Sequence, residues 1–201
     1  MFGVGWLVAA TVALHFLDSD LSLTDTYTSD YALGDYGWLM RSAFFAVGVG
    51  TVAIGLGLRE TLAPGKRVTA SVVLFLIAGV AFVVGGIFNT DPTGITELSA
   101  TGTVHVLASA VLFLSLLVSA WFLRGVFKRD PSWQWFSKAQ LGFAVAYTAA
   151  LIVSFATPEG GAVGLTQRIG IAVLMAWARH PRMEHPQSRF RPRNTLTAQV
   201  R

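Results

Sequence analysis

Six long runs of apolar residues, separated by polar segments, divide the chain. About 20 apolar residues at 1.5 Å each cross a hydrocarbon core about 30 Å thick. Backbone N–H and C=O groups find no water partners in lipid, so each run is predicted to be an α-helix. The runs cover residues 2–17, 37–58, 68–88, 102–123, 139–156 and 164–179. The pattern predicts an all-α, polytopic membrane protein with six transmembrane helices, in which residues 1–179 form one domain.

Charges in the connecting segments differ in sign from one side of these helices to the other. Thirteen of the fifteen Lys and Arg residues fall on one side: Arg59, Lys66, Arg67, Arg124, Lys128, Arg129, Lys138, Arg179, Arg182, Arg189, Arg191, Arg193 and Arg201. The other side carries acidic residues: Asp18, Asp20, Asp25, Asp30, Asp35, Asp91, Glu97 and Glu159. Because basic loops stay in the cytoplasm, both termini are predicted there, with three helical hairpins pointing outward. Residues 180–201 are predicted to be a basic cytoplasmic tail.

The composition agrees with a surface that faces lipid. Hydrophobic residues make up 53% and charged residues 13% of the 201 positions, whereas a soluble domain has about 25% charged residues. The net charge of +4 does not indicate a nucleic-acid partner, because the basic residues follow the predicted membrane sides. The absence of cysteine excludes disulfides and thiolate chemistry. No basic segment precedes the first apolar run, so we expect residues 2–17 to be a retained span and not a signal peptide.

An ionisable side chain follows each outer loop at a similar distance. Arg41, His105 and Arg168 each come three or four residues after a glycine that opens the returning helix. Three or four helical residues span about 5–6 Å, so these side chains are predicted at one depth, just below the outer surface. Ionisable groups inside spans usually face the bundle interior or a cavity. We call the three residues the outer cluster.

Two interpretations of the outer cluster are open. In the first, Asp35, Asp91 or Glu159 pairs with the arginines and His105 bonds to a carbonyl, so the cluster only fixes the helix ends. In the second, a polar or anionic ligand occupies it. A phospholipid headgroup, a quinone, or a substrate phosphate or carboxylate would suit guanidinium geometry.

Histidines in the spans raise the question of a metal or pigment. His15 and His105 are expected at one depth, where two imidazoles can ligate a haem or the magnesium of a chlorophyll-type pigment. A catalytic zinc needs three protein ligands, and Asp91 could converge with these two histidines to supply them. The tail offers a second group, His180, Glu184 and His185, but the prolines that flank it favour a solvated segment. We predict no dedicated metal site, and the sequence has no nucleophile elbow, phosphate loop or dinucleotide motif.

Two further patterns concern packing at and below the outer surface. Residues 21–36 are polar and aromatic and long for a hairpin loop, so they are predicted to form a lid over the outer cluster or a docking surface for another protein. Small residues four positions apart predict close helix packing, as at Ala53 with Gly57 and at Gly142 with Ala146.

Several short motifs resemble one known family. They are residues 29–34, 37–40, 57–59, 86–88 with Asp91 and Pro92, His105, and residues 164–168. Over roughly residues 1–180 the chain resembles the bacterial membrane family called domain of unknown function 998. The resemblance implies six spans in a bacterial cytoplasmic membrane and no established reaction. It also implies that Asp91, His105 and Arg168 occupy the family's polar motif positions. The predicted ligand-binding residues are Arg41, Asp91, His105, Gln167 and Arg168.

Three functional hypotheses follow. The first is a non-enzymatic subunit of a larger photosynthetic or respiratory membrane complex, which binds lipid, quinone or pigment at the outer cluster. Small size and few catalytic motifs favour it. The second is an intramembrane lipid-modifying hydrolase, with His105 as general base or metal ligand and Asp91 orienting it. The third is a small transporter, which the absence of ionisable residues at span midpoints disfavours.

Overall fold

The computed structural model describes residues 2–17, 20–158 and 161–179, and every regular element in that part of the chain is helical. Six α-helices are joined by loops that contain two 3-10 helices. The elements are α1 (Phe2–Leu17), η1 (Thr28–Ala32), α2 (Gly37–Thr61), α3 (Lys66–Ile87), α4 (Ala100–Arg129), η2 (Gln134–Phe136), α5 (Ser137–Ala156) and α6 (Val163–Arg179). The basic tail and Glu159 lie outside the described residues.

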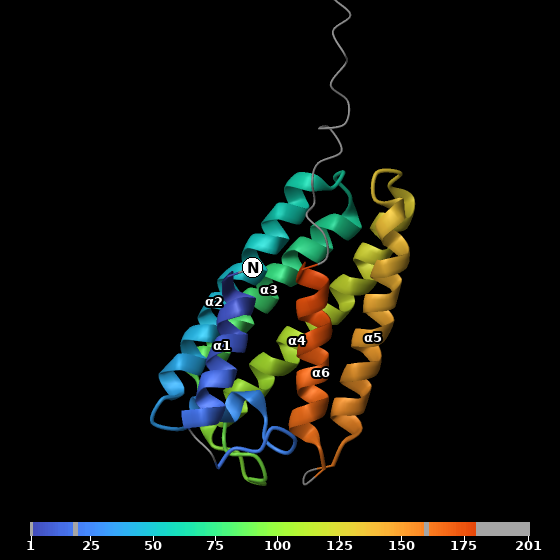
Figure 1. Ribbon diagram of the computed structural model, residues 1–201. Helices are drawn as coiled ribbons and strands as arrows, with labels where there is room; N and C mark the ends of the chain where they lie inside the picture. The colour runs from blue at the N-terminus through green and yellow to red at the C-terminus, as the bar shows by residue number, and fades with distance from the viewer. Residues whose placement is uncertain (1, 18–19, 159–160, 180–201) are drawn as a thin grey trace, which may run out of the picture.

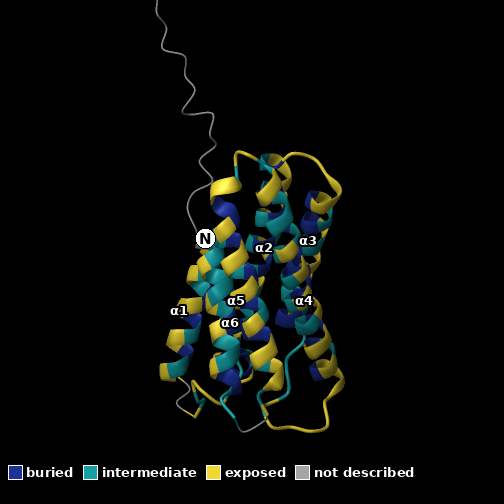
Figure 2. Cartoon of the chain, turned by 90° about the vertical axis from the view of Figure 1, so that its right-hand side faces the viewer, coloured by how far each residue is buried: buried dark blue, intermediate teal, exposed yellow. Residues whose placement is uncertain are grey.

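The helices have the length and surface of a multi-pass membrane protein. Four segments are long and apolar enough to cross a membrane: α2, α3, α4 and Gln134–Ala156. The apolar helices α1 and α6 are shorter, with 16 and 17 residues. Phe2, Phe16 and Phe155 are each at least 70% exposed, and Figure 2 shows exposed residues along the outer sides of the helices. Such a surface is stable when it faces lipid.

Helices extend beyond the apolar runs where the chain becomes basic. The helix α4 continues to Arg129, past the predicted end at residue 123, and α3 begins at Lys66 before the predicted start at residue 68. A helix satisfies its backbone internally, so it need not end where hydrophobicity ends. Lys128 and Arg129 also lie in the last turn of α4, at the negative end of its dipole.

Consecutive helices run in opposite directions. Figure 1 shows the connections after α1, α3 and α5 at one end of the bundle, and those after α2 and α4 at the other. We call the first the η1 end, because η1 belongs to the α1–α2 connection. Each helix packs against its neighbours in sequence, and α1 and α6 are not among the packed helix pairs of the described residues. The bundle therefore has a seam between its first and last helices.

Helices α2 and α3 approach closely at two glycines. A Cβ atom added to Gly48 would lie 2.8 Å from the carbonyl oxygen of Gly79, and one added to Gly79 would lie 2.9 Å from that of Gly48. Gly57 and Gly142 have no atom within 4 Å of an added Cβ. These two glycines of the small-residue pattern therefore do not mark a close approach.

A buried amide joins three helices near the end opposite η1. The Gln140 side chain is fully buried in α5, and its Nε2 donates to the Ala120 carbonyl of α4 at 2.9 Å. Its Oε1 accepts a hydrogen bond from Trp177 Nε1 of α6 at 2.6 Å. Both polar ends of the amide are satisfied, so the contact fixes α4, α5 and α6 relative to one another.

Candidate functional site

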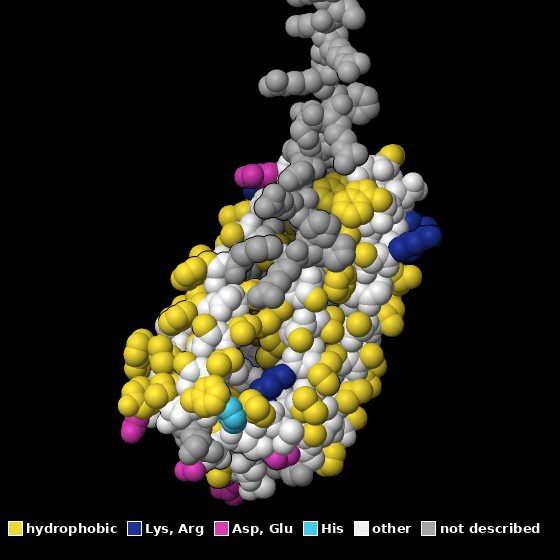
Figure 3. Space-filling view, in the orientation of Figure 1, with side chains coloured by type: hydrophobic (Ala, Val, Ile, Leu, Met, Phe, Trp, Pro, Cys, Tyr) yellow, Lys and Arg dark blue, Asp and Glu magenta, His cyan; other side chains and the backbone are white. Residues whose placement is uncertain are grey.

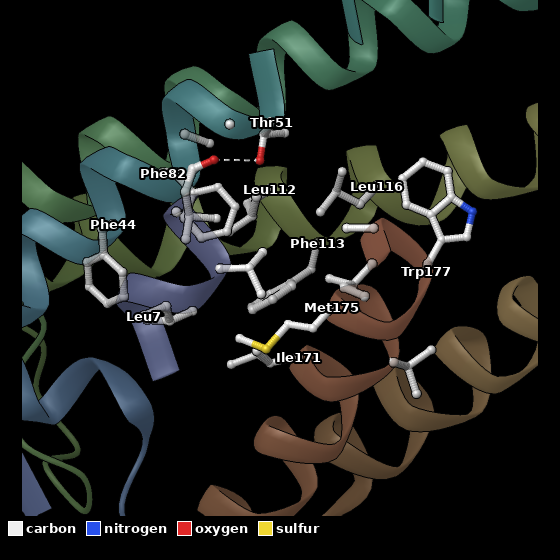
Figure 4. A pocket seen from close by; sticks show the side chains of 18 of the residues that line it. Leu7, Phe44, Thr51, Phe82, Leu112, Phe113, Leu116, Ile171, Met175 and Trp177 are labelled. Atoms are coloured by element: carbon white, nitrogen blue, oxygen red, sulfur yellow. Dashed lines mark hydrogen bonds between the residues drawn. The ribbon is translucent and has the colours of Figure 1, made fainter. Parts of the chain in front are cut away.

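A cavity of about 390 Å³ lies between the helices. Its volume falls in the range of small-molecule pockets, about 300–1,000 Å³. All six α-helices and η1 contribute to a mainly apolar wall. Figure 4 shows Phe82, Leu112 and Phe113 pointing into the cavity, with Ile171 and Met175 opposite on α6. An apolar space of this size inside a bundle suits a hydrophobic ligand.

The two ends of the cavity differ in polarity. Thr28, His105 and Gln167 line it near the η1 end. Leu123 and Trp177 line it toward the opposite ends of α4 and α6. The cavity can thus hold a molecule with one polar end and an apolar body.

His105 is buried at the polar end, with its side chain only 6% exposed. Its Nδ1 lies 2.9 Å from the Phe88 carbonyl oxygen and 3.2 Å from the Gly85 carbonyl oxygen. Because carbonyls only accept, Nδ1 carries a proton and donates it, which leaves Nε2 as the ring nitrogen that can meet a ligand. The carbonyl bond is the one expected by the first interpretation of the outer cluster, while Nε2 remains for a contact with a ligand.

The α1–α2 connection is held against the start of α6. The Thr28 backbone N–H donates to Gln167 Oε1 at 2.8 Å. The Leu165 backbone N–H donates to the Thr24 carbonyl at 2.9 Å. The second bond satisfies one of the free N–H groups at the start of α6. The connection thus covers the η1 end, which is the arrangement of the predicted lid.

Arg168 reinforces this attachment. Its Nη1 donates to the carbonyl oxygens of Leu23 and Thr26, at 2.7 and 2.8 Å. The guanidinium carbon lies 5.6 Å from the centre of the Tyr31 ring, within the range of a cation–π contact. Within the described part of the chain, no carboxylate forms an ion pair with Arg168.

Asp30 joins two connections at the η1 end. Its side chain is 4% exposed, and Oδ2 accepts from the backbone N–H and the hydroxyl of Thr93 at 2.8 and 2.6 Å. Burial raises the pKa of the Asp30 carboxyl above its ordinary value, although the Thr93 bonds and the nearby charges of His105 and Arg168 oppose this. The carboxyl therefore clamps the α1–α2 connection to the α3–α4 connection.

Asp91 lies at the start of α4. Its Oδ2 accepts from the Ser99 backbone N–H at 2.7 Å, and a Cβ atom on Gly102 would overlap the same carboxylate. A carboxylate beside the first turn of a helix is favoured by the helix dipole. The Nδ1 of His105 instead bonds to carbonyls at the end of α3. Asp91 is therefore not the group that orients His105 in this structure.

The other predicted site residues lie apart from the cavity. His15 Nδ1 is 3.2 Å from the Tyr31 hydroxyl, so this ring faces η1. Arg41 is half-buried on α2 and is not among the residues that line the cavity. Within residues 2–17, 20–158 and 161–179, no three His, Asp or Glu side chains are grouped closely enough to hold a metal ion.

Comparison with known families bears on the whole bundle. A family model described as "Protein of unknown function (DUF998)" matches residues 1–179. The chain belongs to this family. The match confirms the resemblance seen in the sequence motifs, and the family description names no activity. No curated protein and no solved structure matches the chain. The function of this DUF998 protein must therefore be argued from the geometry of its site.

The structure adds residues to the site of the DUF998 protein that the sequence did not single out. Thr28, Asp30, Tyr31 and Thr93 hold the η1 end together. Their contacts join connections far apart in the chain, which no local pattern reports. Two signals were available: the length and polarity of residues 21–36, which indicated a lid, and the motif at residues 29–34, which contains Asp30 and Tyr31. Neither names the contacts.

The raised pKa of Asp30 predicts a pH dependence of folding stability. A carboxyl whose pKa is raised in the folded state contributes stability below its unfolded value, and this contribution is lost as the pH rises through the folded pKa. Between about pH 4 and 7, the wild-type DUF998 protein should therefore lose stability relative to Asp30→Asn. Thermal unfolding in detergent across that range measures the difference.

Asp25 lies in the same connection and serves as a control, because its pKa shift has the opposite sign to that of Asp30. Hydrogen bonds from Ser22 and Thr24 lower the pKa of this exposed carboxyl, so its contribution is lost as the pH falls. Relative to Asp25→Asn, the wild-type protein should therefore lose stability as the pH falls. Equal pH profiles for wild type and Asp30→Asn would contradict the assignment to Asp30.

Proposed function

We propose that this DUF998 protein is a non-enzymatic, six-span protein of the bacterial cytoplasmic membrane that holds a membrane-soluble ligand between its helices. The cavity carries the proposal, because its wall is apolar over most of its length and polar at the η1 end. Lipids, quinones and pigments share this division into an apolar body and a polar end. The Nε2 atom of the buried His105 ring and the amide of Gln167 supply hydrogen-bonding groups for the polar end.

The proposed orientation places the η1 end outside the cell. Its support is the charge distribution: Figure 3 shows acidic side chains gathered at this end, and the basic residues of the α2–α3 and α4–α5 connections belong to the opposite end. Cytoplasmic loops are enriched in Lys and Arg. The shorter helices α1 and α6 are included as spans, because both are apolar and lie alongside the longer ones in the bundle (Figure 1).

Single cysteines test this orientation directly, because the protein has none of its own. Thr96 and Ala63 are exposed in the α3–α4 and α2–α3 connections. In intact spheroplasts, a membrane-impermeant maleimide should label Thr96→Cys and leave Ala63→Cys unlabelled until the membrane is opened. Labelling of Ala63→Cys from outside would overturn the orientation.

Mass spectrometry of the purified protein tests ligand binding. Extraction in a polymer that retains the native bilayer, followed by transfer into a defined synthetic lipid, should leave one class of native amphiphile bound in near-stoichiometric amount. Loss of every native molecule during the transfer would contradict the proposal.

The proposal also includes membrane partners, as expected for a small protein with few catalytic motifs. The protein in the gentle extract should then migrate as a larger particle. A free monomer would argue against the partners and leave the proposed ligand binding unaffected.

A further inference from the structure

The seam between α1 and α6 contains a groove that adjoins the cavity. The groove holds about 160 Å³ and is lined by both helices and by Thr28 of η1. Figure 3 shows basic and histidine side chains near a hollow between α1 and α6, on a face otherwise covered by hydrophobic side chains. In the membrane this groove faces lipid, because no described helix covers the seam.

One layer of side chains separates the groove from the cavity. Leu7, Thr28, Ile171 and Met175 line both spaces. Figure 4 shows Ile171 and Met175 of α6 opposite Leu7 of α1. No backbone hydrogen bond between α1 and α6 has to break for these side chains to move, and leucine and methionine change rotamer readily in apolar surroundings. The seam is therefore a path from the bilayer into the cavity that only side chains close.

An incompletely satisfied cation lies at the edge of this path. Arg168 lines the groove, and its Nη1 is satisfied by the lid carbonyls. Its Nε and Nη2 are buried and have no hydrogen-bond partner among the described residues. The hydroxyl of Thr28, which lines both spaces, is also buried without a partner. Unpaired buried donors of a charged group are strongly unfavourable, so an acceptor supplied to this edge would stabilise the folded protein.

The free donors have the geometry of an anion site. The Nε–H and one Nη2–H of a guanidinium point the same way and bind two oxygens of one phosphate or carboxylate. The Tyr31 ring and the Asp30 carboxyl lie near this charge, but a neutral ligand would offer no countercharge to the two free donors. The two satisfied Nη1 bonds hold the guanidinium in place, so its free edge is oriented before the ligand arrives.

We infer that the ligand is a membrane lipid with an anionic headgroup, which enters sideways through the α1–α6 seam. Two headgroup oxygens bind Arg168 Nε and Nη2, and one chain passes between Leu7 and Met175 into the cavity. The inference rests on the proposed function for the cavity, and on the proposed orientation for the outer leaflet as the source of the lipid.

Lipid competition in nanodiscs tests the headgroup. The probe is phosphatidylglycerol present as a minority in phosphatidylcholine, counted on the protein by native mass spectrometry. The wild type should retain phosphatidylglycerol over phosphatidylcholine, and Arg168→Gln should lose about tenfold in that preference, the effect of one charge-assisted pair. The matched control is Arg41→Gln, which removes an arginine expected at the same depth that lines neither space. Equal losses in both variants would overturn the role of Arg168.

Soluble glycerol phosphate separates a lipid site from a site for free anions. It should not displace bound phosphatidylglycerol, because it lacks the chain that the cavity holds. Displacement at concentrations comparable to those of the lipid would overturn the lipid assignment. Native ligand retained in the cavity without preference for an anionic headgroup would refute this inference and leave the proposed function intact.

A cross-link across the seam tests the path even if Arg168→Gln fails to fold. Val8 on α1 and Ala172 on α6 line opposite sides of the groove. In the cysteine-free chain, Val8→Cys with Ala172→Cys can be joined by a short bismaleimide. Cross-linking should slow exchange of fluorescent phosphatidylglycerol about tenfold or more, whereas modification of the same variant with N-ethylmaleimide should slow it less. Equal exchange rates in the two samples would show that lipid does not use the seam.

Discussion

Gly37→Ala should displace η1 and lower the free energy of unfolding by about 1–3 kcal/mol. A Cβ atom at this position would overlap the backbone oxygen and carbon of Ala32, the last residue of η1. Ala32 and Tyr31 are both buried, so η1 cannot move without exposing apolar surface. Backbone atoms cannot rotate away as the end of a side chain can. Thermal unfolding in detergent measures the loss.

Gly57→Ala is the matched control on the same helix. No atom lies within 4 Å of an added Cβ at Gly57, so this change should be neutral or stabilise the helix by up to about 1 kcal/mol. In Gly37→Ala the displacement of η1 should also loosen the lid. Greater protease sensitivity of the α1–α2 connection than in Gly57→Ala would report it. Equal unfolding temperatures for the two variants would contradict the contact at Ala32.

Hydrophobic runs predicted the six helices because two constraints coincide in a membrane protein. The run must be long enough to cross the bilayer, and its backbone must be satisfied internally. Helix ends were less predictable, since α4 continues through Arg124 and Lys128 to Arg129. Basic residues at the membrane surface favour the last turn of a helix and so extend it beyond the apolar run.

Spacing along a helix predicted the depth of the site residues and left their direction open. Arg41 and Arg168 each follow a helix-opening glycine by four residues. Arg168 contacts the lid and lines the α1–α6 groove, whereas Arg41 is half-buried away from both spaces. Which way a side chain faces depends on how its helix is rotated against its neighbours. That rotation is set by packing across the bundle, as at Gly48 and Gly79, and one helix alone does not encode it.

Contacts between connections were the least predictable part of the site. Thr28 meets Gln167 across 139 residues, and Asp30 meets Thr93 across 63 residues. Each pair contains residue types that are common in loops, so neither partner stands out alone. Their meeting requires three hairpins to be assembled at the η1 end. The lid that covers the polar end of the cavity is thus a consequence of the tertiary fold.

Gly50→Phe should empty the cavity of its ligand without destabilising the bundle. Gly50 lies near the middle of α2 and lines the cavity, and no atom lies within 4 Å of an added Cβ. A phenyl ring there would take the space of the ligand, and overpacking of about 1–3 kcal/mol corresponds to about a five- to 150-fold loss of binding. Replacement of glycine by phenylalanine within a helix favours folding by about 0.3–0.5 kcal/mol. Ligand retention and stability of the ligand-free protein should therefore change in opposite directions.

Gly57→Phe separates this effect from helix propensity. Gly57 lies two turns further along α2 with equally open surroundings, and it does not line the cavity. It should gain the same helical preference and keep the ligand, as measured by mass spectrometry of the purified variants. Every helix contributes to the wall of the cavity, so a bound ligand stabilises the assembled bundle. Removal of the ligand should therefore lower the unfolding temperature of the wild-type protein. Retention of the native amphiphile by Gly50→Phe would show that it binds elsewhere, and the cavity would then have no part in the function.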